Sequence, residues 1–108
     1  MKIIDIGHSN YSADKAISVL ETEVSSAMCS NKIRSIKIIH GHGSGILRKA
    51  VRRWCQEQKG RFRDVIPGEE HDLFHRKSIA MRQESGLPDD MDFFRMNRAV
   101  TYLWLYKK

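Results

Sequence analysis

An isoleucine-rich segment that passes directly into a glycine-rich turn constrains the fold of this chain more than any other feature. Residues 33–40, IRSIKIIH, have the composition of a mostly buried β-strand. The turn 41–45 follows, and residues 46–60 then place apolar side chains at three- and four-residue steps, which predicts an amphipathic helix. Strands that alternate with helices of this length are typical of an α/β protein with a largely parallel sheet.

The same alternation continues in both directions. Residues 2–6 predict a short buried strand, and residues 13–30 predict a helix with Ser12 as its N-cap. Residues 61–66 predict a third strand, and residues 99–106 predict the last one. The order of elements is therefore β-α-β-α-β, an irregular segment, and a final strand.

Residues 68–98, which we call the insert, show the weakest pattern. Apolar residues at helical spacing predict a helix within 71–84, and residues 85–98 predict an ordered loop. The expected hydrophobic anchors of that loop are Met91, Phe93, Phe94 and Met96. In the last strand, alternation places Tyr102, Trp104 and Tyr106 on one face, where core packing is favoured over stacking on bases.

Length and charge narrow the classes of protein. A chain of 108 residues fits a single domain, and 19 Lys+Arg against 13 Asp+Glu give a net charge of +6, which favours polyanionic partners. No apolar run approaches the roughly 20 residues of a membrane helix, and the N-terminus does not fit a secretory signal. Cys29 and Cys55 form no CxxC pair. Reduced thiols in a cytoplasmic protein are therefore the expectation.

The turn between the second strand and the second helix is the candidate ligand site. Open α/β folds bind ligands at the carboxyl ends of their strands, and free amides at a helix N-terminus attract anions. Basic side chains follow at helical spacing, so the pattern predicts a site for a phosphate backbone. The candidate nucleic-acid-binding residues are Gly41, His42, Gly43, Ser44, Gly45, Arg48, Lys49, Arg52 and Arg53. The alternative is a short connection followed by a solvated helix face.

Other ligand motifs do not fit this turn. Its GxGxG spacing is not the dinucleotide fingerprint, and it lacks the Gly-Lys-Ser/Thr ending of a P-loop. His40 and His42, or His71 and His75, have spacings that occur in metal sites, but neither pair has an obvious third ligand. The sequence therefore predicts no metal and no cofactor.

The segment 36–54, IKIIHGHGSGILRKAVRRW, resembles the core of the small MutS-related (Smr) domain family, whose signature is written HGKGxGxLR. The resemblance covers about residues 2–67 and the closing strand. It implies an α/β two-layer sandwich with a four-stranded mixed sheet, in the order β-α-β-α-β-(insert)-β. It also implies a nucleic-acid-binding module, because several members of the family nick DNA or cleave RNA.

Two departures from the family pattern concern the first strand and the insert. The family's LDLHG segment stands here as Ile4-Asp5-Ile6-Gly7-His8, with glycine and histidine exchanged. Asp5 matches its family counterpart by position, whereas His8 matches only if the turn bulges. The insert is longer than the usual connection to the last strand.

Phosphodiester cleavage needs a base, an acid and donors to the phosphorane oxygens. We expect His40 and His8 to transfer protons, Asp5 to orient an imidazole, and the amides of 43–45 with Arg48 to hold the anion. Without a metal, RNA is the better substrate because it supplies its own 2′-hydroxyl. The structural alternatives are a solvated His8, an Asp5 that caps its turn, and a His40 that holds the glycine turn in place.

The leading hypothesis is a nucleic-acid-binding Smr-like domain with endonuclease activity on DNA or RNA. The first alternative is a non-catalytic adaptor that binds nucleic acid while the insert docks a protein partner. An enzyme acting on a small phosphorylated molecule is the third hypothesis, although nothing outside the turn defines a pocket for one.

Overall fold

Four strands form one mixed sheet in the computed structural model of the chain, which describes residues 1–93 and 95–106. The elements in chain order are β1 (Lys2–Asp5), α1 (Ala13–Met28), β2 (Ser35–Ile39), α2 (Ile46–Glu57), β3 (Asp64–Pro67), a short 3₁₀ helix (Gly68–Glu70), α3 (Arg76–Glu84) and β4 (Val100–Trp104). The sheet order is β1-β2-β4-β3. β1 is parallel to β2, whereas β4 is antiparallel to both of its neighbours. This arrangement confirms the predicted α/β fold and four-stranded mixed sheet.

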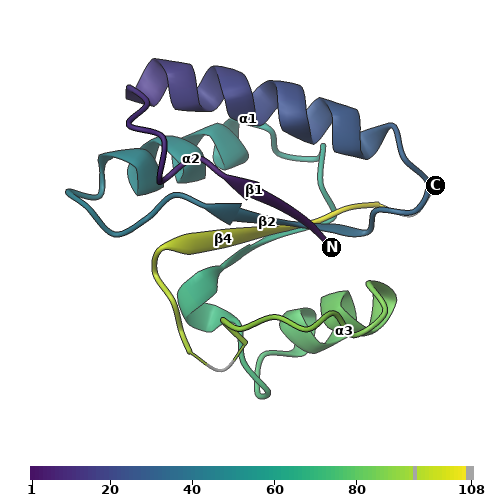
Figure 1. Cartoon of the computed structure of the whole chain (residues 1–108). Coiled ribbons are helices and arrows are strands. Elements are labelled where there is room, and N and C mark those ends of the chain that lie inside the picture. Colours follow the sequence, from purple (N-terminus) through teal and green to yellow (C-terminus); the bar gives the residue numbers. More distant parts are fainter. Residues whose placement is uncertain (94, 107–108) are drawn as a thin grey trace.

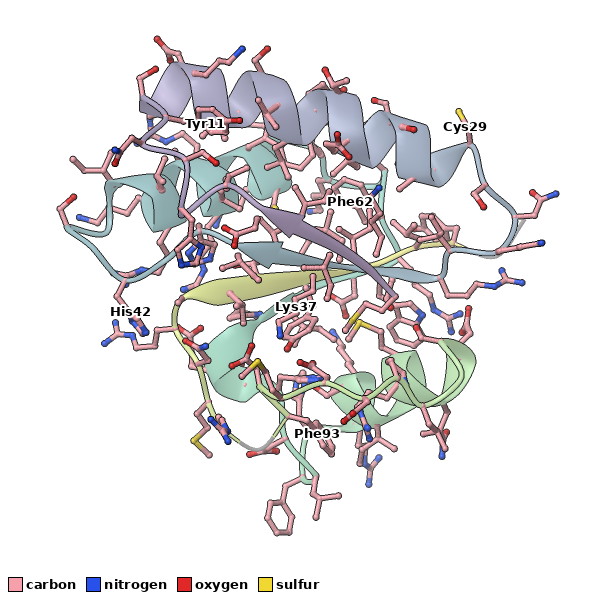
Figure 2. The ribbon with its side chains drawn as sticks, in the orientation of Figure 1. Tyr11, Cys29, Lys37, His42, Phe62 and Phe93 are labelled. Carbon is pink, nitrogen blue, oxygen red and sulfur yellow. The ribbon has the colours of Figure 1, made fainter. Side chains whose placement is uncertain are left out.

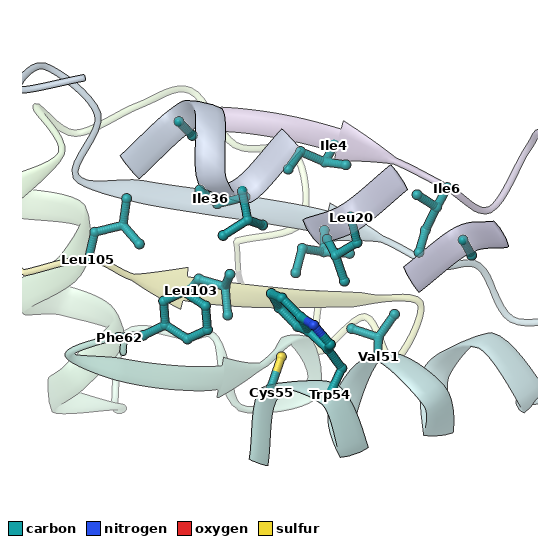
Figure 3. Close-up of a cluster of buried hydrophobic side chains, with 14 residues drawn as sticks. Ile4, Ile6, Leu20, Ile36, Val51, Trp54, Cys55, Phe62, Leu103 and Leu105 are labelled. Carbon is teal, nitrogen blue, oxygen red and sulfur yellow. The ribbon is translucent and has the colours of Figure 1, made fainter. Parts of the chain in front are cut away.

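The larger part of the core lies between the sheet and the helices α1 and α2, which cover one face (Figure 1). Ile36, Ile38 and Leu103 point from the two central strands toward this layer, and all three are fully buried. Figure 3 shows Leu20 from α1 and Val51 and Trp54 from α2 meeting them. The apolar stripes that predicted the two helices therefore form most of their buried faces, but Ile46 at the start of α2 is 62% exposed. Ser12 caps α1 as expected, because its side chain accepts a hydrogen bond from the Lys15 amide (3.2 Å).

The insert covers the opposite face of the sheet (Figure 1). A second apolar cluster there combines Ile66, Val100, Tyr102 and Trp104 from the strands with Met81 from α3. The two-layer arrangement therefore holds for the helices α1 and α2, and the insert adds a partial third layer. Tyr102 and Trp104 lie in the core as predicted, but Tyr106 beyond the strand is 55% exposed.

A buried ion cluster attaches the insert to the sheet. Lys37 of β2 bonds Asp90 Oδ1 (2.7 Å) and also pairs with Asp92, while the Tyr102 hydroxyl donates to Asp90 Oδ2 (2.6 Å). Figure 2 shows Lys37 between the sheet and the insert. Burial opposes the charge on Lys37, but the bonds from the two carboxylates raise its pKa above the ordinary value. Burial likewise opposes ionisation of Asp90, but His71, Lys37 and Tyr102 hold the pKa of its carboxyl below the usual range.

The structure has a helix within 71–84 as predicted, but several other details of the insert and its surroundings are wrong. α3 begins only at Arg76, so Leu73 and Phe74, which were counted toward the helical spacing, precede it and are exposed. Met91 and Met96 are exposed rather than anchored, whereas Phe93 contacts the His71 ring; Phe94 lies outside the described residues. The third strand lies later than predicted, at Asp64–Pro67.

Cys29 is exposed and Cys55 is buried, and neither forms a disulfide. Over residues 1–93 and 95–106, no helix has both the length and the apolar content needed to span a membrane.

Candidate nucleic-acid interface

The turn between β2 and α2 leaves the positive end of α2 without a side-chain cap. Gly45 is the N-cap, and its φ of +84° lies in the left-handed region, which glycine adopts at least cost. The Ile46 amide donates to Ser44 Oγ at 3.4 Å, the one side-chain contact recorded at this helix start in the described chain. The remaining partial positive charge of the helix dipole faces solvent.

Arg48 adds a full positive charge at the same place. Its guanidinium nitrogen lies 3.1 Å from the position that a Cβ on Gly45 would occupy, so the side chain folds back over the start of α2. No described carboxylate forms an ion pair with Arg48. The helix end and the guanidinium together form a site suited to an anion.

The loop after β1 packs against this turn. The amides of Ile6 (2.9 Å) and Gly7 (3.1 Å) both donate to the Ile39 carbonyl. A Cβ on Gly7 would lie 2.9 Å from the carbonyl carbon of His40, closer than a side chain can approach. Glycine at position 7 is therefore a steric requirement of this contact, and histidine follows it instead of preceding it.

Asp5 and His8 form a hydrogen-bonded pair at the rim of the turn. Asp5 Oδ2 lies 2.6 Å from His8 Nδ1, and Asp5 Oδ1 accepts the Gly7 amide at 3.0 Å. The carboxylate therefore caps the loop and also contacts the imidazole, and its role in catalysis stays a prediction. The His8 side chain is 78% exposed, and its Nε2 has no recorded protein partner in the described chain.

His40 lies beneath the turn with both ring nitrogens in contact with protein. Nε2 is 2.9 Å from Thr101 Oγ1, Nδ1 is 3.4 Å from the Gly41 carbonyl, and the residue is 3% exposed. Burial lowers the pKa of the ring to about 4, and the charges of Arg52 and Arg48 act in the same direction. A neutral ring at pH 7 then donates from Nδ1 to Gly41 and accepts the Thr101 hydroxyl at Nε2. The proton-transfer role expected for His40 stays a prediction that this geometry does not favour.

These loops enclose an open cleft of about 710 Å³. Its walls come from residues of the loop 7–13, the turn 39–48, Asn97 at the end of the insert, and Ala99 between the insert and β4. His8, His42 and Arg48 all line it. Figure 2 shows His42 at the outer end of the turn, pointing away from the sheet, and His42 is exposed.

Three of the four predicted cations of α2 are free to meet a ligand. Arg48, Lys49 and Arg53 have no ion-pair partner within the described residues. Arg52 instead binds both carboxylate oxygens of Glu69 (2.6 and 3.0 Å) and approaches the Thr101 hydroxyl at 3.3 Å. Burial opposes the Glu69 charge, but these bonds hold the pKa of that carboxyl below its ordinary value. Arg52 therefore links α2 to β4 and to the short 3₁₀ helix, and it is not a free cation as the other three are.

Comparison with known proteins places this geometry in a family. The family model described as the Smr domain matches residues 8–72, which is more than half of the chain. The chain belongs to the Smr domain family. Smr domains are known as nucleic-acid-binding or endonuclease-like modules, and the signature from His40 to Arg48 lies inside the matched range.

A solved structure supports the Smr fold over the whole chain. The crystal structure of the Smr domain of Thermus thermophilus MutS2 superposes with a TM-score of 0.64 and covers 98% of this chain and 99% of its own. The two sequences are only 16% identical, so the likeness concerns the fold. No curated protein matches the chain by sequence.

The described residues include no group of three His, Cys, Asp or Glu side chains that could hold a metal ion. His71, half of the His71/His75 spacing, is buried against the Tyr102 ring, and His75 bonds Ser78 Oγ at 2.8 Å.

Sequence reasoning missed the part of the Smr cleft that comes from the end of the insert. Asn97 and Ala99 line the cleft, and the Ala99 carbonyl accepts the amides of His40 (2.9 Å) and Gly41 (3.0 Å). No local sequence pattern predicts that these two residues line the cleft, because their position depends on β4 lying beside β2. Tyr11 also lines the cleft, and its place between the glycine loop and the N-cap of α1 was the available signal.

Proposed function

We propose that this Smr domain binds the sugar-phosphate chain of a nucleic acid in the cleft beside the start of α2. The observation that carries the proposal is the uncapped helix end with Arg48 folded over it, unpaired by any described carboxylate. Lys49 and Arg53 extend the positive surface along the exposed side of α2. Phosphate groups match such a surface in charge and in hydrogen-bonding geometry.

Binding at low salt tests this proposal directly. Labelled single-stranded and double-stranded DNA and RNA should each be titrated with protein over a series of salt concentrations. We expect affinity to fall steeply with salt and Arg48→Ala to weaken every ligand that binds. Absence of binding to all four ligands at low salt would refute the proposal and leave α2 as a solvated helix.

We propose further that the Asp5–His8 pair makes the domain an RNA-cleaving endonuclease. Asp5 holds Nδ1 of His8, and Nε2 can accept the proton of a ribose 2′-hydroxyl. The 2′-oxygen then attacks phosphorus, and the bond to the 5′-oxygen breaks to leave a 2′,3′-cyclic phosphate. The leaving oxygen takes a proton from water, and the hydroxide that forms takes the proton from His8, which restores the neutral imidazole. Arg48 and the free amides of α2 stabilise the charge on the phosphoryl oxygens. DNA lacks the 2′-hydroxyl, so this route does not apply to it.

Cleavage and binding are separated by single substitutions. Plasmid DNA and a structured RNA should be incubated with the protein, with and without a chelator. We expect RNA cleavage that His8→Ala and Asp5→Asn reduce by about two orders of magnitude or more while binding persists. His75→Ala is the matched control, since His75 lies in the insert. Cleavage that survives His8→Ala would overturn this role.

The second candidate is a non-catalytic adaptor, and the burial of His40 favours it. The cleft would then offer the exposed, hydrogen-bonded Asp5–His8 pair and an anion site, but His40 would not act as a base. Exposed apolar side chains of the insert, among them Leu73, Phe74 and Met91, would suit a protein partner. The absence of cleavage in the presence of tight binding would select this candidate. We propose a cytoplasmic location, which the two free thiols, Cys29 and Cys55, support.

A further inference from the structure

A second hollow lies between α2 and the edge strand β3, separate from the turn cleft. It measures about 650 Å³. Cys55 and Phe62 contribute to its floor and are almost fully buried; Figure 3 shows both pointing into the core cluster beside α2. The lining residues with polar groups are Arg52, Gln56, Gln58, Lys59, Arg63, Asp64 and Tyr106. We call this hollow the α2–β3 groove.

The groove continues the turn cleft along the same helix. Arg48 lines the cleft, and Arg52, one turn later, lines the groove. Four residues of α-helix advance by about 6 Å, so the two hollows are neighbours along α2. A chain that leaves the cleft toward the C-terminal end of α2 enters the groove.

Lys59 gives the groove one unpaired positive charge, which suits a phosphate group. Lys59 is exposed and has no ion-pair partner in the described part of the chain. The one carboxylate in the lining, Asp64, is neutralised because Lys77 binds its Oδ2 at 2.7 Å. Arg52 and Arg63 also line the groove, but Glu69 pairs with Arg52 (2.6 Å) and Glu84 pairs with Arg63 (3.4 Å), so Lys59 supplies the unpaired charge of the described lining.

An added peptide strand is a poor fit to this edge. The Val65 amide of β3 donates to Asp64 Oδ1 at 2.8 Å, and Pro67 has no amide hydrogen. A strand that joined β3 would therefore find these backbone donors missing. The β3 edge is therefore poorly suited to a peptide strand. Lys59 and the ring of Tyr106, both in the lining, suit a nucleic acid better.

We propose that the α2–β3 groove binds the single-stranded continuation of the nucleic acid held in the turn cleft. Lys59 contacts phosphate, and the half-exposed Tyr106 ring stacks on an unpaired base at the rim. A duplex keeps its base faces covered, so stacking selects a single strand. This inference rests on the proposed binding function and extends it to the strandedness and path of the ligand.

The length of α2 sets the length of ligand that reaches both sites. Its 12 residues span about 18 Å. A stacked strand advances by roughly 3.4 Å per nucleotide, so about five nucleotides run the length of the helix. An oligonucleotide of about four nucleotides can then contact either the turn cleft or the α2–β3 groove, whereas one of about twelve nucleotides can contact both.

The test compares these two lengths on four proteins. Anisotropy titrations with labelled single strands would use the wild type, Lys59→Glu, Tyr106→Ala and the control Arg76→Glu. Arg76 is exposed on α3, across the sheet from the groove, and its reversal changes the net charge as Lys59→Glu does. We expect Tyr106→Ala to weaken the longer strand about 5- to 100-fold, and Lys59→Glu to lower its salt slope by about one. Tyr106→Phe should retain most of the affinity.

Each result decides the question. If the groove variants bind the longer strand with the same affinity as Arg76→Glu, the proposal that the groove binds nucleic acid is wrong. If Arg48→Ala still weakens binding in that case, the proposed binding in the turn cleft stands. If a groove variant weakens the binding of short and long strands equally, the groove does not extend the binding site of the cleft. A wild type that binds neither strand removes the proposed function together with the groove.

Discussion

The buried neutral imidazole of His40 links the glycine turn to the sheet. Its ring accepts from Thr101 on β4, and Thr101 in turn receives the Arg52 side chain from α2. Protonation would place a charge beside Arg52 and Arg48 and remove the acceptor that Thr101 uses. The same environment that lowers the pKa of His40 to about 4 therefore makes the turn sensitive to acid.

The stability of the protein should fall between pH 6.5 and 4 because of His40. The unfolded chain binds a proton at this residue below an ordinary pKa of about 6.5, whereas the folded chain resists it down to about 4. The free energy of unfolding then decreases by up to about 3 kcal/mol as the pH falls through this window. Urea titrations at several pH values would measure the decrease. His40→Gln should flatten it, and the exposed His42→Gln should not.

The sequence predicted that Asp5 could orient an imidazole without saying which one, and it did not predict the burial of His40; the difference follows from separation along the chain. Asp5 and His8 are three residues apart, so a tight turn suffices to join them. The partners of His40 include Thr101, 61 residues away, and a strand pairing that no local pattern specifies. Glycine at position 7 looked like a departure from the family, and only the distance to the His40 backbone explains it.

At the scale of elements, the insert is held by buried ions and contributes a wall of the cleft. The Lys37–Asp90 pair joins positions 53 residues apart, with side chains 4% and 1% exposed. Composition predicted three of the four strands, alternation predicted the third one along the chain, and helical periodicity predicted α1 and α2. The insert lacks so regular a pattern, which is why Leu73 and Phe74 were wrongly counted toward its helix and Met91 and Met96 were wrongly expected as anchors.

Removal of Asp90 should destabilise the protein strongly. Asp90→Ala leaves the Lys37 ammonium and the Tyr102 hydroxyl buried without this carboxylate, although Asp92 still contacts Lys37. Loss of one partner of a buried ion pair typically costs about 3–5 kcal/mol. Chemical denaturation would measure this cost, and the exposed neighbour substitution Asp89→Ala should change stability by less than about 0.5 kcal/mol. Equal effects of the two substitutions would mean that the cluster does not hold the insert.

Gly7→Ala should disturb the contact between the loop after β1 and the turn that contains His40. The added methyl group meets the His40 carbonyl carbon at 2.9 Å, and backbone on both sides has little freedom to move. Overpacking of this kind costs about 1–3 kcal/mol. Thermal melting would detect the loss, and Ser9→Ala, two residues later on an exposed part of the loop, is the control.

At the scale of the whole molecule, positive charge is distributed unevenly. The insert carries seven Asp and Glu against five Lys and Arg, so the excess that gives the chain +6 lies outside it. α2 alone contributes four cations and a single carboxylate. The face that holds the cleft is therefore basic, while the insert on the opposite face of the sheet is not. Composition predicted a preference for polyanions, but which side of the molecule carries the positive charge followed only from the fold.

Charge reversal on this face should weaken nucleic-acid binding more than the same reversal elsewhere. Lys49→Glu with Arg53→Glu removes two exposed cations of α2, whereas Arg76→Glu with Arg95→Glu makes the same change of net charge on the insert. If each α2 cation neutralises one phosphate, the first double variant lowers the slope of log affinity against log salt by about two. Long-range attraction alone would make the two variants equivalent, because both change the total charge alike. Anisotropy titrations from about 50 to 200 mM salt separate these cases, and equal losses would show that net charge, not the α2 face, governs binding.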